Sequence, residues 1–287
     1  MAPATRSLLP LALGLLAGGL PGPSRAQLPL NIEALLVSEQ RLTVSVSSSR
    51  GSHREPLLQP AAAAPVPAPA PALAWRELTV EQANVGLRYG VTARLELNAQ
   101  YQRSSLRWDL NEQFAAAASG ERLVVGGNWL AARGAGGSLL LDARLAAFGR
   151  PLGADDGWQR ATAGSLGATW YRPLDPVVLS VAARYRREAP RDTAVGRRRP
   201  GDRLSADAAV NFAVNDRVTL IGGFGLRRRE PDRIAGRAVG GTRLRTTLDA
   251  GLALSPWARG TLFLRGALPL GAAEAGGSLS LELQQTF

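Results

Sequence analysis

The sequence has no cysteine and no lysine, and its 287 residues include a single histidine, His53. Without cysteine an exported chain has no disulfide framework, so its stability must come from other interactions. One histidine also excludes a His/Cys metal cluster, and no nucleophile elbow or His-Glu-x-x-His pair is present. We therefore expect no enzyme, no cofactor and no metal, and we place His53 in a solvated loop.

Long apolar runs are missing after the first 26 residues, so no stretch of about 18 apolar residues is available for a transmembrane helix. The beginning of the chain has a positive residue, Arg6, and an apolar stretch from Leu8 to Leu20. Ser24-Arg25-Ala26 then places small residues where a signal peptidase cleaves. We expect residues 1–26 to be a signal peptide, and the lack of a following cysteine excludes a lipoprotein anchor.

Acidic residues are too few to balance the arginines, and the formal net charge is +11 with a pI near 11.3. Loss of Arg6 and Arg25 with the signal peptide leaves 32 basic against 23 acidic residues, a net +9. Such a charge would ordinarily suggest nucleic-acid binding. Here the arginines alternate with apolar residues or lie in loops without a recognisable motif, so we expect no nucleic-acid partner.

Alternation of apolar and polar residues with period 2 recurs from about residue 42 to the last residue. Leu95, Leu97 and Tyr101, for example, alternate with Glu96 and the polar residues that follow it. This pattern indicates half-buried strands. The expected strands are 42–50, 78–89, 94–103, 121–132, 138–148, 160–171, 177–187, 203–214, 217–229, 242–254, 259–269 and 276–287.

The connections between these strands alternate between short and long. Short links such as Asn215-Asp216 join strand pairs, and longer polar or Gly/Pro-rich segments separate the pairs, at 51–77, 104–120, 149–158, 188–202, 230–241 and 270–275. A soluble sandwich has no reason to keep this order, whereas an outer-membrane barrel has short periplasmic turns and longer outer loops. We therefore predict an all-β fold over 42–287, a transmembrane antiparallel up-and-down β-barrel of about 12 strands in the bacterial outer membrane.

Two segments lie outside this regular pattern. Residues 27–41 are expected as a periplasmic lead-in, in which 32–39 could form a helical turn or an occluding plug. The first outer loop, at about 51–77, contains a Pro/Ala-rich stretch that favours extended polyproline II geometry.

The final strand carries the sharpest local signal. Leu279, Leu281, Leu283 and Phe287 share one face, and polar residues occupy the other. A closing amphipathic strand with a terminal Phe resembles the signal by which bacterial outer-membrane barrels are handed to their insertion machinery, which we expect as a partner.

The segment 84–97, with the sequence NVGLRYGVTARLEL, resembles a strand-turn-strand unit of a family of outer-membrane proteins. That family is named for the meta-pathway of phenol degradation. The resemblance covers about residues 28–287 loosely and implies uptake or efflux of small molecules, without catalytic residues. The Pro/Ala-rich first loop departs from the family's pattern.

The inward face is expected to carry charges of both signs. The residues concerned are Arg88, Glu96, Asp142, Arg144, Arg184, Arg186, Asp207, Arg227, Arg245, Asp249, Arg265 and Glu282. They could pack the barrel interior, or they could line a narrow pore whose excess of arginine attracts anions. The sequence thus favours a passive channel or transporter for small, anionic or aromatic solutes. The alternative is a structural or assembly barrel with a plugged lumen and partner-binding loops.

Runs of arginine occur at the ends of three expected strands or loops. They are Arg186-Arg187, Arg197-Arg198-Arg199 and Arg227-Arg228-Arg229. They could form a solvated rim, or they could pair with lipopolysaccharide phosphates, because the guanidinium group binds phosphate through two parallel hydrogen bonds. Lipid and lipopolysaccharide of the outer membrane are therefore expected partners.

Overall fold

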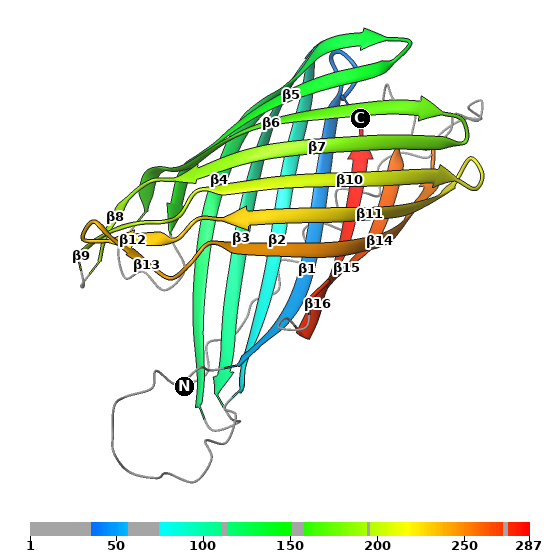
Figure 1. Cartoon of the computed structure of the whole chain (residues 1–287). Coiled ribbons are helices and arrows are strands. Elements are labelled where there is room, and N and C mark those ends of the chain that lie inside the picture. Colours follow the sequence, from blue (N-terminus) through cyan, green and yellow to red (C-terminus); the bar gives the residue numbers. More distant parts are fainter. Residues whose placement is uncertain (1–35, 57–74, 111–113, 151–157, 194–195, 272–274) are drawn as a thin grey trace, which may run out of the picture.

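The alternating segments form one closed ring of strands. The computed structural model describes residues 36–56, 75–110, 114–150, 158–193, 196–271 and 275–287, and its main sheet is a barrel of twelve antiparallel strands (Figure 1). The barrel strands are β1 Leu42–Pro56, β2 Trp75–Thr92, β3 Leu95–Leu110, β4 Phe114–Gly134, β5 Gly137–Arg150, β6 Gln159–Leu174, β7 Val177–Glu188, β10 Arg203–Ala213, β11 Val218–Arg229, β14 Arg243–Trp257, β15 Gly260–Pro269 and β16 Ala275–Thr286. Every one of the twelve expected strands overlaps one of these, and the predicted fold class is confirmed.

Closure joins the first strand to the last. Strand β1 pairs with β16 from Thr43, opposite Thr286, to Arg54, opposite Ala275. Beyond the last strand residue, the N–H of Phe287 donates to the carbonyl of Leu42 at 2.8 Å. A closed ring leaves no unpaired sheet edge, which hydrocarbon requires because it offers no hydrogen-bond partners.

The barrel is polar inside and apolar outside. Glu96 and Thr219 are fully buried, whereas Leu166 and Leu244 are 64% and 63% exposed. A water-soluble protein buries its large aliphatic side chains, and one exposing so many would be unusual. This inverted arrangement is that of a barrel whose outer wall faces lipid.

The short connections all lie at one end of the barrel. Tight turns join β2 to β3, β4 to β5, β6 to β7, β10 to β11 and β14 to β15. The beginning of β1 and the end of β16 lie at the same end, because these strands pair antiparallel from Thr43 and Thr286 onward. We call it the short-turn end, and the opposite one the long-loop end.

Several strands continue farther toward the long-loop end than the sequence predicts. Most of 104–120, expected as a loop, belongs to β3 and β4, and the first loop is shorter than 51–77 because β1 and β2 extend to Pro56 and from Trp75. The placement of His53 in a loop is wrong, because it lies in β1 opposite Leu78 and Gly276. Strand ends that project beyond the hydrocarbon need no apolar face, so they carry little alternation. The proposed signal peptide and the Pro/Ala-rich stretch lie outside the described residues.

Two expected loops contain a small second sheet. Segments 188–202 and 230–241 form β8 Arg191–Thr193, β9 Gly196–Arg199, β12 Asp232–Ile234 and β13 Arg237–Val239, in the order β13-β12-β9-β8. Figure 1 shows this sheet at the long-loop ends of β7, β10, β11 and β14. Pairing of β9 with β12 connects the two loops to each other. None of the described residues forms a helix long and apolar enough to cross a membrane.

Candidate functional site

The inner wall of the barrel is the candidate site. Residues directly opposite in neighbouring antiparallel strands share one face, and alternate residues along a strand do too. Twelve charged residues were predicted to face inward. When the strand pairing is followed from Arg88 around the ring, all twelve lie on the same face of the sheet. This face includes the buried Glu96 and Asp142, so it is the inner one.

Glu96 on β3 is the centre of the most enclosed polar cluster. Arg88 binds its carboxylate through both Nε and Nη2, at 2.8 and 2.7 Å, and Nδ2 of Asn128 donates to Oε1 at 2.7 Å. The fourth donor is the backbone N–H of Val37, at 2.8 Å from Oε2. A buried carboxylate is costly without partners, and these donors satisfy both of its oxygens.

The lead-in passes directly over this cluster. Leu36 and Val37 are buried, and a turn follows in which the N–H of Arg41 donates to the carbonyl of Ser38 at 3.1 Å. Gln40, with φ of 58°, donates its N–H to the carbonyl of Gly90. The carbonyls of Val37 and Ser38 lie where a β-carbon of residue 90 would be, so only glycine fits there. Of the expected lead-in, residues 36–41 therefore pack inside the wall near the short-turn end, and the remainder lies outside the described residues.

A second cluster joins β5 and β7. Nη2 of Arg184 lies 3.2 Å from Oδ1 of Asp142, and Nε of Arg144 lies 3.5 Å from the same oxygen. Gly167 stands between Asp142 and Arg184 in the register, and a β-carbon there would overlap the Asp142 carboxylate. The glycine therefore makes room for an ion pair that spans a strand.

Nearer the long-loop end, four arginines form a row on one wall. Each arginine of this row lies opposite the next one on the neighbouring strand. In order around the ring they are Arg186 on β7, Arg203 on β10, Arg229 on β11 and Arg243 on β14. We call these four residues the arginine row. One level nearer the short-turn end, Arg227 is opposite Arg245. Like charges directly opposite in a sheet repel, so this wall has a concentrated positive potential.

Two carboxylates partly compensate the arginine row. Oε1 of Glu188 lies 3.1 Å from Nη2 of Arg203 and 3.5 Å from Nη2 of Arg186. Oδ1 of Asp232, in the small sheet, lies 2.8 Å from Nη2 of Arg229. Each acid thus contacts arginine side chains without matching the number of arginines on the wall.

The remaining predicted inward residues lie in smaller groups. Oδ1 of Asp207 and Oδ2 of Asp249 lie 3.0 and 3.5 Å from the position that a β-carbon on Gly225 would occupy. The guanidinium of Arg265 lies 5.1 Å from the ring centre of Phe263, on the same face. Glu282 accepts a hydrogen bond from Nε2 of Gln284 at 2.7 Å.

The residues of the predicted insertion signal lie on the opposite, outer face. Leu279, Leu281 and Phe287 are 59%, 48% and 50% exposed. Leu283 lies two residues after Leu281 in β16, so it is on the same face. These side chains face lipid, and their recognition by insertion machinery stays a prediction.

Three arginines of the row were not among the predicted inward residues. Arg229 and Arg243 have the parity of Arg227 and Arg245, and Arg203 has that of Asp207. Period 2 would have identified them had it been extended to the strand ends. The arginine runs at strand ends are also divided between faces, because Arg187 and Arg228 point outward while Arg186 and Arg229 point inward.

Comparison with solved structures supports the fold. An outer-membrane channel from Pseudomonas putida F1 matches with a TM-score of 0.67 and 16% identity, over 88% of this chain and 97% of that chain. The translocator domain of autotransporter NalP from Neisseria meningitidis matches at 0.55 and 15%, over 86% and 88%. The β domain of the Bordetella autotransporter BrkA matches at 0.56 and 12%, over 85% and 99%. No family model and no curated protein matches the sequence.

These likenesses establish a barrel of the outer-membrane class. They agree, at the level of the fold, with the outer-membrane family that segment 84–97 resembles, and with the expected outer-membrane location. Channels and autotransporter domains share this architecture, so the function must be argued from the inner wall.

Proposed function

We propose that this protein is an outer-membrane channel for passive passage of small anionic solutes, aromatic carboxylates among them. The observation that carries the proposal is the arginine row on the inner wall. Arginine remains charged at any physiological pH, and a charged ring or wall in a pore selects ions of opposite sign. The Pseudomonas putida protein of similar fold is an outer-membrane channel, which is consistent with such a role.

The chemistry of the wall favours carboxylates in particular. A guanidinium group binds a carboxylate through two parallel hydrogen bonds, and it also stacks on aromatic rings. Glu188 and Asp232 already form ion pairs with arginines of the row, so a solute carboxylate would exchange with them step by step. Exchange among partners of similar strength suits passage, because the solute must also leave.

Conductance of the refolded protein in a planar bilayer tests the proposal. We expect discrete steps in the ionic current. In a salt gradient, the sign of the reversal potential should be that of an anion-selective channel. Aromatic carboxylates added on one side should reduce the chloride current by competition. A cation-selective channel would contradict the assignment of the arginine row.

The second candidate is a structural or assembly barrel with a plugged lumen and loops that bind a partner. It is favoured by the burial of Leu36 and Val37 inside the wall, where the N–H of Val37 donates to Glu96. A correctly folded barrel that conducts no ions in the bilayer would favour it over the channel. We assign no catalytic activity to either candidate, and phospholipid hydrolysis at the level of the protein-free control by both the wild type and His53→Ala would agree with this.

A further inference from the structure

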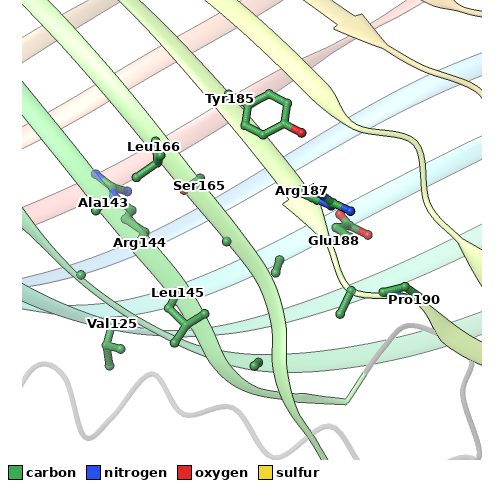
Figure 2. A pocket seen from close by; sticks show the side chains of 15 residues that line it. Val125, Ala143, Arg144, Leu145, Ser165, Leu166, Tyr185, Arg187, Glu188 and Pro190 are labelled. Carbon is green, nitrogen blue, oxygen red and sulfur yellow. The ribbon is translucent and has the colours of Figure 1, made fainter.

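The outer wall has a hollow on its lipid side that the channel proposal does not use. It has a volume of about 650 Å³ and is formed by β4, β5, β6 and β7 (Figure 2). Val125, Leu145 and Leu166 line it and are 37%, 45% and 64% exposed, which places it on the outer face. Because β7 ends at Glu188 beside it, the hollow belongs to the half of the barrel nearer the long-loop end.

Small residues create the hollow. Gly164 lies between Leu145 of β5 and Arg187 of β7 in the register, and a β-carbon on it would meet only the carbonyl of Arg144, at 4.0 Å. The register between β5 and β6 shifts after Ala146, and Ala161 has a positive φ of 49°. A bulge of this kind bends its strand and changes the direction of the side chains.

Two exposed arginines lie on the same face at the long-loop side of the hollow. Arg187 is exposed and lines it, and Arg160, which is exposed and is the register partner of Phe148, comes immediately before Ala161. Within the described parts of the chain neither guanidinium has an ion-pair partner. Two described acids near Arg187 are engaged, because Glu188 binds Arg186 and Arg203, while Asp202 accepts a hydrogen bond from Tyr185.

The level of these arginines is that of a membrane interface. Trp158, which is 53% exposed, precedes Arg160, and Tyr185 precedes Arg187 on the same face of β7. Tryptophan and tyrosine gather at the boundary between hydrocarbon and headgroups in membrane barrels. An interface at Trp158 and Tyr185 would place the apolar hollow on its hydrocarbon side and the two cations at the depth of lipid phosphates.

We propose that this hollow is a binding site for lipopolysaccharide, with an acyl chain of lipid A in the hollow over Gly164 and a lipid A phosphate on Arg160 and Arg187. The mostly apolar lining disfavours a polar solute, and the guanidinium groups of Arg160 and Arg187 carry the positive charge and the hydrogen-bond donors that a phosphate binds. An outer-leaflet lipid carries both required parts in one molecule. The site is separate from the lumen, so it does not depend on the channel proposal.

Binding of a fluorescent rough lipopolysaccharide to the full-length mature protein in neutral detergent tests this site. The variant Gly164→Leu fills the hollow, and we expect it to weaken binding roughly fivefold. Its control is Gly222→Leu, which adds the same side chain at an exposed position of β11 where a β-carbon meets nothing within 4 Å. Arg160→Gln combined with Arg187→Gln should weaken binding by a similar factor.

The arginine variants have a control on the same strand. Arg172 is exposed on β6 two residues from its short-turn end, so Arg172→Gln removes one positive charge at the other side of the membrane. We expect it to bind lipopolysaccharide as the wild type does, and inorganic pyrophosphate, which has no acyl chain, to compete poorly. Unchanged binding by Gly164→Leu would overturn the proposal, and so would equal losses in the two glycine variants. Heat-modifiable migration confirms folding, and unchanged conductance keeps this result distinct from the channel test.

Discussion

Oε2 of the Glu96 carboxylate accepts a hydrogen bond of 2.8 Å from the N–H of Val37, a residue 59 positions earlier in the chain. This contact joins the lead-in to the inner wall of β3. It also links two questions about the barrel, namely how its interior is stabilised and how far its short-turn mouth is narrowed. The first two predictions concern this contact.

Glu96→Ala should strongly destabilise the barrel. The change leaves Arg88, Asn128 and the N–H of Val37 without their shared acceptor in a buried place. We expect a loss of about 2–4 kcal/mol in the free energy of unfolding, measured in urea by tryptophan fluorescence. Glu282→Ala is the control, because Glu282 is only partly buried and accepts its hydrogen bond from the side chain of Gln284. Equal losses in the two variants would contradict the importance of the cluster.

Gly90→Ala should displace the lead-in without removing any charge. A β-carbon on residue 90 overlaps the carbonyls of Val37 and Ser38, so residues 36–41 must move away from β2. We expect a larger single-channel conductance in the planar bilayer. Gly222→Ala, at a position without a close neighbour, should conduct as the wild type does. A conductance equal to that of the wild type in Gly90→Ala would mean that the lead-in does not narrow the mouth.

Removal of two arginines from the row should weaken anion selectivity. Arg203→Gln with Arg229→Gln lowers the positive charge of the inner wall by two, and we expect the reversal potential to move toward zero. The control, Arg228→Gln, changes the charge by one at a neighbouring residue that faces outward. Because field effects decline with distance and salt, the difference between these variants should be largest below about 0.1 M salt. A similar shift per charge in the control would show that position on the wall does not matter.

Asp232 should hold the small sheet together even in mild acid. Burial opposes its ionisation, but hydrogen bonds from the N–H of Gly201 and the side chains of Arg198 and Arg229 hold the pKa of Asp232 well below its usual range. Since the folded pKa lies below the unfolded one, the stabilisation is present at neutral pH and is lost only as pH falls below about 4.

Amide hydrogen exchange in β9 and β12, corrected for the intrinsic rate, measures this dependence. Protection should stay constant from pH 7 to about pH 4.5 and then decrease. In Asp232→Asn it should be low throughout, with a loss of about 1–2 kcal/mol. A midpoint near pH 6 in the wild type would contradict the role of this carboxylate.

Phe287→Ala should impair assembly in cells more than refolding in detergent. The backbone N–H of Phe287 still bonds to Leu42 in this variant, so closure of the barrel is retained. If the exposed aromatic ring is read by the insertion machinery, the folded fraction in the outer membrane should fall several-fold. The refolded yield in detergent should remain close to that of the wild type. A parallel decrease in both yields would indicate a role in stability alone.

Much of the barrel could be predicted because its strands repeat one rule. Lipid on one side and a polar interior on the other make residue parity sufficient to assign a face, as for Arg184 and Tyr185 on β7. The lengths of the strands were underestimated at the long-loop end, where β3 continues through 104–110 without the regular alternation of its earlier part. The small sheet was missed for a related reason, because its strands have only three or four residues and pair across two different loops.

The amino-acid sequence by itself determined that this chain closes into a transmembrane barrel, and it determined which side chains point inward. Only the tertiary structure decided which of them meet. Parity along a strand assigns a face, but the level of a residue depends on the register between strands. That register places Arg186, Arg203, Arg229 and Arg243 in one row and brings Val37 to Glu96. Turn geometry fixes the register of strands joined by short turns, such as β10 and β11, but the register of β7 with β10 and of β11 with β14 is set by pairing around the whole ring.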